Sequence, residues 1–188
     1  SIATRCDCLN DDVINFLDEV SLIKPIWLEL GLQTSNDKTG EILNRGYNFN
    51  DFKAALDRLS KTNIKVCVHI INGLPYEEEK DMLQTILDIR HLPFKAIKIH
   101  ILHILKDTKL YELYKEKPFE ILSREKYLEI VVKQLELLNK EIIIERLTGD
   151  PMIDELIEPK WLIKKVTILN DIDKLMRKLD TYQGIKYE

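Results

Sequence analysis

The sequence predicts an α/β fold: a partial (β/α) TIM-like barrel of parallel strands covered by helices, with its N-terminal part missing. Short, almost wholly apolar runs alternate with longer segments of helical periodicity. Strands without a polar face are typical of parallel sheets, which are buried on both sides, and right-handed crossovers curl such sheets toward a barrel. The chain opens at Ser1 without a Met, and Ile2-Ala3-Thr4 resembles the end of a strand already under way. We therefore expect a fragment or a processed chain.

Each element has its own signal. Asn10-Asp11-Asp12 is a helix cap, and the helix through Val20 places Val13, Ile14, Phe16, Leu17 and Val20 on one apolar face. Pro25 marks a loop before the strand that starts at Trp27. Further strands are expected at 65–71, 96–102 and 141–146. Further helices are expected at 37–43, 50–60, 77–89, 107–114, 123–138 and from Pro159 to Asp180.

Length and composition limit the class of protein. The 188 residues, 45% hydrophobic and 32% charged, suffice for one domain with a buried core. We divide it into a barrel part, 1–115, and a helical extension with one further strand, 116–188. No apolar run reaches the roughly 20 residues of a membrane span, so no membrane partner is expected. Three cysteines without a disulfide spacing make the cytoplasm the default location.

Polar residues follow the strand that starts at Trp27. Gln33, Thr34 and Ser35 come after an apolar run that contains Glu29. Side chains just past the carboxyl ends of parallel strands line the ligand crevice, so these three are expected to face a bound molecule. Helix capping is an equally open interpretation. Arg45 is expected to lie near the same ligand crevice.

Histidines mark the next two strands. His69 lies in an apolar strand, where a histidine satisfied by a neighbouring carbonyl is an alternative to a ligand contact. His100 and His103, three residues apart, fall on opposite faces of a regular strand, which argues against a shared metal. The Cys6–Cys8 spacing also lacks a matching second pair, so no metal ligands are assigned.

A last polar group follows the strand at 141–146. Arg146 and Asp150 straddle a Thr-Gly turn. They could form a local ion pair that contributes little, or grip an anionic or hydroxylated substrate.

Several of these strand ends, in order, resemble the later part of the radical S-adenosylmethionine (SAM) enzyme core. The matching segments are Ser-Ile-Ala-Thr-Arg-x-Asp-Cys at 1–8, Glu-Leu-Gly-Leu-Gln-Thr-Ser at 29–35, Asn-Arg-Gly at 44–46, Ile-Asn-Gly-Leu-Pro at 71–75, Lys-Ile-His-Ile-Leu-His at 98–103 and Arg-Leu-Thr-Gly-Asp at 146–150. The resemblance covers nearly the whole chain. Within this family the chain resembles uncharacterised bacterial and archaeal proteins related to the elongator catalytic subunit and to oxygen-independent coproporphyrinogen dehydrogenase.

The resemblance implies two cofactors, SAM and a [4Fe-4S] cluster. In the family a CxxxCxxC loop after the first strand holds the cluster, and this sequence has no such loop. The ligands are therefore expected upstream of Ser1, and this fragment alone is expected to be inactive. For SAM, the resemblance implies Gln33 near the ribose and methionine, Arg45 at the methionine carboxylate and Ile101 along the adenine. Ser35 and His69 complete the implied cofactor contacts, although many relatives carry an acidic or amide residue at the position of His69.

The implied chemistry is reductive cleavage of SAM to a 5'-deoxyadenosyl radical, with electrons from an external donor. Candidates for positioning the unknown substrate are Glu29, His100, His103, Arg146 and Asp150. Elongator-like relatives act on RNA, which makes tRNA one possible substrate. The net charge of -4 does not favour RNA, but Lys160, Lys164 and Lys165 could form a local basic face. The alternative is a cluster-free β/α domain that binds a nucleotide or a protein partner.

Overall fold

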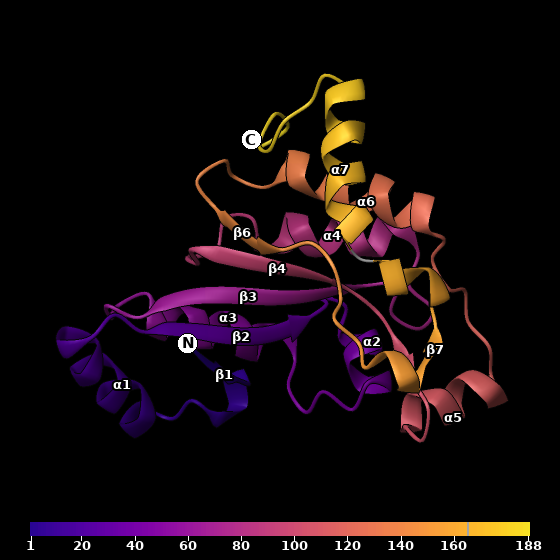
Figure 1. Cartoon of the computed structure of the whole chain (residues 1–188). Coiled ribbons are helices and arrows are strands. Elements are labelled where there is room, and N and C mark those ends of the chain that lie inside the picture. Colours follow the sequence, from indigo (N-terminus) through magenta and orange to yellow (C-terminus); the bar gives the residue numbers. More distant parts are fainter. Residues whose placement is uncertain (165) are drawn as a thin grey trace.

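Five parallel strands form the central sheet of this computed structural model, which describes residues 1–164 and 166–188 (Figure 1). The strand order is β1-β2-β3-β4-β6, and each neighbouring pair is parallel. Their bounds are β1 Ile2–Thr4, β2 Trp27–Gln33, β3 Lys65–Asn72, β4 Ala96–Ile101 and β6 Ile143–Arg146. The order follows the sequence, as expected for consecutive right-handed β/α units. The predicted α/β fold with a partial TIM-like barrel arrangement is confirmed.

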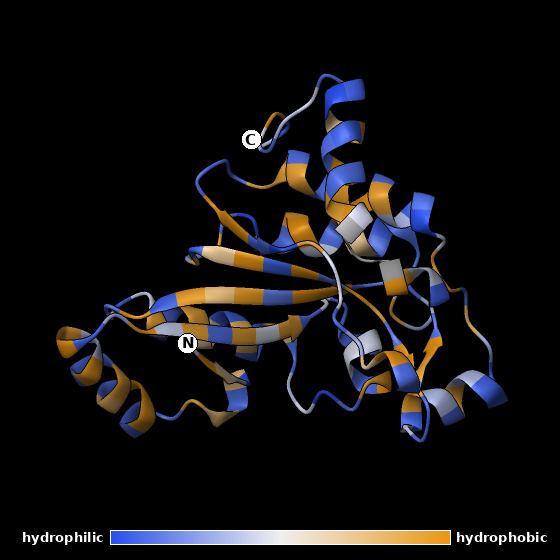
Figure 2. Cartoon of the chain, viewed as in Figure 1, coloured by the Kyte–Doolittle hydropathy of each residue, from blue (hydrophilic) through white to orange (hydrophobic). Residues whose placement is uncertain are grey.

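Helices connect the strands and cover the sheet. Their bounds are α1 Asp11–Ile23, α2 Asp37–Ile42, α3 Phe49–Leu59, α4 Glu79–Ile89, α5 Lys109–Glu116, α6 Arg124–Leu137 and α7 Val166–Lys178, with short 3-10 turns η1 Cys6–Cys8, η2 Ile153–Glu155 and η3 Lys160–Lys164. Apolar side chains of α1, α3, α4, α6 and α7 belong to the hydrophobic core, and hydrophobic and hydrophilic residues alternate along α4, α6 and α7 (Figure 2). The predicted caps are present: Asn10 accepts a hydrogen bond from Val13 N, and Ser123 accepts one from Lys126 N.

The two faces of the sheet differ. In β2, the side chains of Leu28, Leu30 and Leu32 are completely buried, whereas the residues between them are only partly buried. Because side chains alternate along a strand, Glu29 and Gln33 point to the other face. We call the helix-covered side the outer face, and the side that carries Glu29 and Gln33 the inner face.

The C-terminal part contains elements that the sequence did not predict. β5 (Ile104–Leu105) and β7 (Leu156–Glu158) form a two-stranded antiparallel sheet, although neither was expected as a strand. The segment after Pro159 begins as the 3-10 turn η3 before α7, and not as one continuous helix. At two or three residues, β5 and β7 are too short to show a periodic pattern.

One predicted helix face was wrong. In α1, Ile14 and Leu17 are buried, but Phe16 is 63% exposed and Val13 is 37% exposed. These two side chains line a shallow groove beside β1 together with Ile2 and Leu28. The apolar stripe of α1 is therefore wider than the surface it covers in this chain.

Candidate functional site

A pocket of about 250 Å³ opens on the inner face at the carboxyl ends of β2, β3 and β4. It is lined by Gln33, His69, Ile71, His100, Ile101, Leu102 and His103. These residues come from three consecutive strands and from the two positions that follow β4, and they meet because parallel strands end at the same edge of the sheet. Four polar side chains and three apolar ones thus share a cavity smaller than the roughly 300–1,000 Å³ of sites that hold a whole drug-sized ligand.

Gln33 has an unusual backbone conformation. Its φ of 66° lies in the left-handed region, and the pairing of β2 with β3 shifts register between Gly31 and Gln33. A non-glycine residue held in this region costs about 1–3 kcal/mol, and such residues cluster at functional sites. Nearby, Tyr47 donates a hydrogen bond to Gly31 O at 2.6 Å, and its hydroxyl lies 3.1 Å from Gln33 Oε1. The bend and Tyr47 together fix the position of the Gln33 amide.

Two histidines face each other in the pocket. The rings of His69 and His100 lie 5.2 Å apart, and Nε2 of His100 is buried without a hydrogen-bond partner among the described residues. Burial, together with the nearby His69, lowers the pKa of His100 to about 4. The pKa of His69 is lowered as well, chiefly by burial. Both rings are therefore neutral at pH 7, and His100 Nε2 is left to exchange a hydrogen bond with a ligand.

His103 joins this pair, contrary to expectation. We predicted that His100 and His103 would lie on opposite faces of a strand, and this is wrong because β4 ends at Ile101. The chain bends after that residue, so both histidines line the same pocket. His103 Nδ1 lies 3.3 Å from Ile101 O. Among the described residues, no group of three or more His, Cys, Asp or Glu side chains is arranged to hold a metal ion.

A charged network lies on the inner face below the histidines. Lys98 donates to Glu29 Oε2 at 2.6 Å, and its Nζ lies 3.5 Å from Glu145 Oε2. His69 Nε2 also lies 3.0 Å from Glu29 Oε2, a close polar contact without the direction of a good hydrogen bond. The hydrogen bond from Lys98 holds the pKa of Glu29 below its usual range. The carboxylate is thus ionised at neutral pH and already engaged by Lys98.

Arg45 lies outside the histidine pocket. Its guanidinium makes four hydrogen bonds: to Tyr47 O at 2.8 Å, Leu32 O at 3.0 Å, Thr34 O at 2.5 Å and Asp37 Oδ1 at 2.8 Å. The side chain is only 3% exposed, and it is stacked over the ring of Tyr47. Arg45 therefore holds the backbone at the end of β2 and reaches the pocket through Tyr47.

Thr34 and Ser35 turn toward helix α4. Thr34 Oγ1 donates to Glu77 Oε1 at 2.6 Å, and Ser35 Oγ donates to Asp88 Oδ2 at 2.6 Å. Ser35 also contacts Thr85 of α4, and neither Thr34 nor Ser35 lines the histidine pocket. Of the three polar residues expected to face a ligand, only Gln33 lines that pocket.

The remaining candidates surround a neighbouring cavity. Arg146 and Asp150 line a space of about 480 Å³ between the end of β6 and Leu169 of α7. Glu29 is connected to this cavity by Lys98, which contacts both Glu29 and the cavity residue Glu145. The basic face expected at 160–165 is described only at exposed Lys160, because Lys165 and the side chain of Lys164 lie outside the described residues.

Sequence reasoning missed two residues of this region. Lys98 was not singled out, although the alternation of β4 puts it on the same face as His100, and its register with His69 places it on the strand beside that histidine, from where its long side chain reaches Glu29. Tyr47 carries no sequence signal, because it reaches Gly31 only through the turn that follows α2. The first could have been found from strand alternation; the second required the structure.

Two family matches follow one another along the chain. Residues 1–89 match the Radical SAM superfamily, and residues 94–178 match the Radical_SAM C-terminal domain. The chain belongs to the radical SAM superfamily.

Relatives support this assignment. The chain is 41% identical over 184 residues to the uncharacterized protein YtqA of Bacillus subtilis, covering 98% of this chain and 57% of that protein. It is 26% identical over 152 residues to a tRNA uridine(34) acetyltransferase of Methanocaldococcus jannaschii, covering 79% of this chain and 28% of that protein. This radical SAM chain thus spans little more than half the length of YtqA.

A solved structure shares the fold. The structure of Elp3 from Methanocaldococcus infernus, with residues 1–46 deleted, superposes with a TM-score of 0.81 at 19% identity, covering 97% of this chain and 42% of that one. The likeness extends over the sheet and its helices. No described helix is both long and apolar enough to cross a membrane.

The two family cofactors fit this chain differently. The inner-face pocket offers an amide, three imidazoles and the apolar side chains of Ile71 and Ile101, a donor set that suits a nucleoside. The cysteines do not suit a cluster: Cys6 and Cys67 are buried, Cys8 is exposed, and burial raises the pKa of the Cys67 thiol to about 12. The residues present fit the adenosyl part of SAM and do not fit an iron-sulfur cluster.

Proposed function

We propose that this chain is the later part of a radical SAM enzyme core and binds the adenosyl part of SAM in the inner-face pocket. The single observation that carries the proposal is the convergence of Gln33, His100 and Ile101 on one cavity at the strand ends. The unpaired Nε2 of His100 supports it, because a buried nitrogen without a partner is costly unless a ligand satisfies it. The superfamily match to residues 1–89 supports SAM as that ligand.

Each lining residue has a part in this proposal. The Gln33 amide donates to and accepts from the ribose and methionine end of the ligand, and Ile101 packs along the adenine. His69 contacts the ribose hydroxyls, while its ring lies against that of His100 and near the Glu29 carboxylate. Arg45 and Ser35 were expected to touch SAM directly; in this proposal Arg45 instead positions Gln33 through Tyr47, and Ser35 fastens the strand end to α4.

Cluster-bound SAM, cleaved with electrons from an external donor, would supply a 5'-deoxyadenosyl radical that abstracts hydrogen from the substrate. The cluster ligands would belong to a segment that this sequence does not contain. Substrate is positioned by His103 at the pocket and by Glu29, Arg146 and Asp150 along the inner face, whereas His100, expected among the substrate contacts, faces the adenosyl ligand in this proposal. We propose tRNA as the substrate class, in line with the relative named a tRNA uridine(34) acetyltransferase.

The test uses the full-length protein, purified without oxygen and reconstituted with iron and sulfide. We expect a brown protein that forms 5'-deoxyadenosine from SAM after reduction. Gln33→Ala should weaken SAM binding at least tenfold, which corresponds to about 1.4 kcal/mol, and leave the cluster absorbance unchanged. The matched control is Gln84→Ala on the exposed side of α4, which should keep full affinity.

The same experiment separates the alternative class. A cluster-free nucleotide- or partner-binding domain would bind adenosine derivatives, take up no iron and form no 5'-deoxyadenosine. If the protein takes up iron and Gln33→Ala binds SAM with undiminished affinity, the assignment as a radical SAM enzyme stands, but the inner-face pocket is not the SAM site.

A further inference from the structure

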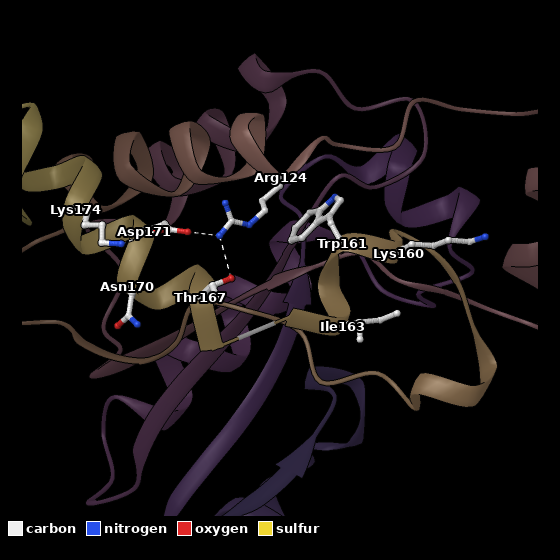
Figure 3. A pocket seen from close by; sticks show the side chains of 8 residues that line it. All are labelled: Arg124, Lys160, Trp161, Ile163, Thr167, Asn170, Asp171 and Lys174. Carbon is white, nitrogen blue, oxygen red and sulfur yellow. Dashed lines mark hydrogen bonds and ion pairs between the residues drawn. The ribbon is translucent and has the colours of Figure 1, made fainter.

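A further cavity, of about 620 Å³, lies between α6, η3 and α7, away from the inner face of the sheet (Figure 3). Its lining residues are Arg124, Lys160, Trp161, Ile163, Thr167, Asn170, Asp171 and Lys174. Three of them are cationic and one is anionic, whereas the whole chain has a net charge of -4. Positive charge is therefore concentrated on this cavity against the balance of the protein.

The cations are held in different ways. Arg124 is fixed by an ion pair with Asp171 and donates to Thr167 Oγ1 at 3.0 Å, as the dashed lines in Figure 3 show. Lys174 lies 3.4 Å from Asp171 and keeps its side chain 76% exposed. Lys160 is exposed and has no charged partner among the described residues. One ion-paired guanidinium and two exposed ammonium groups thus border the same space.

Trp161 forms an aromatic wall of this cavity. Its Nε1 donates to Leu122 O at 2.9 Å, and its ring lies 5.7 Å from that of buried Tyr127. The Tyr127 hydroxyl in turn donates to Leu147 O at 3.0 Å. The indole is therefore held by Leu122 O and the Tyr127 ring while it lines the cavity.

Residues around Gly149 connect this cavity with the inner-face pocket. Leu162, next to Trp161, packs so near Gly149 that a Cβ there would lie 3.3 Å from Leu162 Cδ2. The same Cβ would lie 3.2 Å from His103 Nδ1, which lines the inner-face pocket. Gly149 therefore lies between His103 of the inner-face pocket and Leu162, which is the chain neighbour of Trp161.

We propose that this cavity binds the phosphate backbone of an RNA substrate, an inference that rests on the proposed function and names a docking site for it. Lysine, arginine, threonine and asparagine side chains are the usual phosphate contacts, and they carry no sequence information. An aromatic side chain beside them accepts a sugar or base by stacking. RNA held here would extend past the loop at Gly149 toward the inner-face pocket.

The test measures total tRNA binding to the full-length protein over a range of salt concentrations. Lys160→Gln/Lys174→Gln should weaken binding at least tenfold at low salt and make the slope of log K against log salt shallower by roughly 1–2, since each lost phosphate contact contributes roughly 0.7–0.9. Asn170→Asp, which adds a carboxylate to the cavity, should weaken binding without removing a lysine. The matched control is Lys24→Gln/Lys95→Gln, at two exposed lysines that precede β2 and β4 at the opposite end of the sheet.

Equal losses in the cavity and control variants, or no tRNA affinity in the unmodified protein, would overturn the docking site. SAM affinity, measured on the same preparations, reports separately on the proposed function. Retained SAM binding with an unaltered salt slope in Lys160→Gln/Lys174→Gln would reject this inference alone. Preference for an acidic protein such as polyglutamate over tRNA would reject it as well.

Discussion

The outer and inner faces of one sheet differ in what their side chains are used for. On the outer face of β2, three leucines are completely buried under helices. On the inner face, the positions between them carry Glu29, Gly31 and Gln33, and the next strands add His69, Lys98 and His100. A parallel sheet is usually apolar on both faces. The polar side chains of the inner face therefore indicate that this face binds a ligand and is not covered by an apolar layer.

The largest expected effect is on the outer face. Leu30→Ala should lower the free energy of unfolding by about 2–5 kcal/mol, because it leaves a cavity at a fully buried position. SAM affinity, measured well below the unfolding transition, should change little. Urea unfolding and equilibrium dialysis provide the two numbers. A loss of affinity without a loss of stability would show that the two faces are not separate in function.

Arg45→Ala should come next. The change removes donors to Leu32 O, Thr34 O and Tyr47 O, of which Leu32 O keeps a hydrogen bond from Thr34 N, so we expect about 2–4 kcal/mol of destabilisation from the lost hydrogen bonds of this buried guanidinium. Arg45→Lys should recover only part of this, since one ammonium cannot reproduce the guanidinium fork. If Arg45→Ala abolished SAM binding and left the stability unchanged, Arg45 would contact SAM directly and would not act by supporting the strand end.

His100 should give the inner face a pH dependence. Its pKa is about 4 in the folded protein and 6.5 as the reference value, so the unfolded chain binds the proton first as the pH falls. The free energy of unfolding is therefore unaffected by this histidine above pH 6.5. It falls by roughly 1–3 kcal/mol as the pH drops from 6.5 to 4, because the unfolded chain gains the proton first. Unfolding of wild type and His100→Asn at several pH values should show a shallower decline in the variant. Parallel curves would contradict the burial of this imidazole.

Ser35→Ala should have the smallest effect. It removes the hydrogen bond to Asp88, which corresponds to a loss of about 0.5–1.5 kcal/mol in unfolding free energy. Because Ser35 lies outside the pocket, SAM affinity should be unchanged. A tenfold weaker affinity would restore Ser35 to the cofactor contacts that the sequence resemblance implied.

The sequence predicted the regular part of the fold well. Apolar runs around Leu30, Val68 and Ile99 fixed three central strands, and the caps at Asn10 and Ser123 fixed two helix starts. Elements without periodicity, such as β5 and β7, were missed because their pairing joins residues far apart in the chain. The division at residues 115 and 116 and the cytoplasmic location stay predictions.

The candidate site was predictable only where backbone regularity determines direction. Gln33 and Ile101 share a pocket because each ends a parallel strand. Thr34 and Ser35 follow Gln33 directly, yet the positive φ of Gln33 turns the chain toward α4. The bend after Ile101 brought His103 beside His100 in the same way. A local change of backbone direction is not encoded in residue spacing, so these side chains were misplaced.

Gly31→Ala provides the most direct measurement, because a Cβ at this position would lie 2.5 Å from Gln33 Nε2 and would displace the amide on the inner face alone. Binding of SAM to the full-length protein should weaken at least tenfold, whereas Ile97→Val, a small change at a buried position, should bind normally. Normal binding by Gly31→Ala, with the Gln33 amide shown to have moved, would contradict the assignment of the inner-face pocket to the adenosyl ligand.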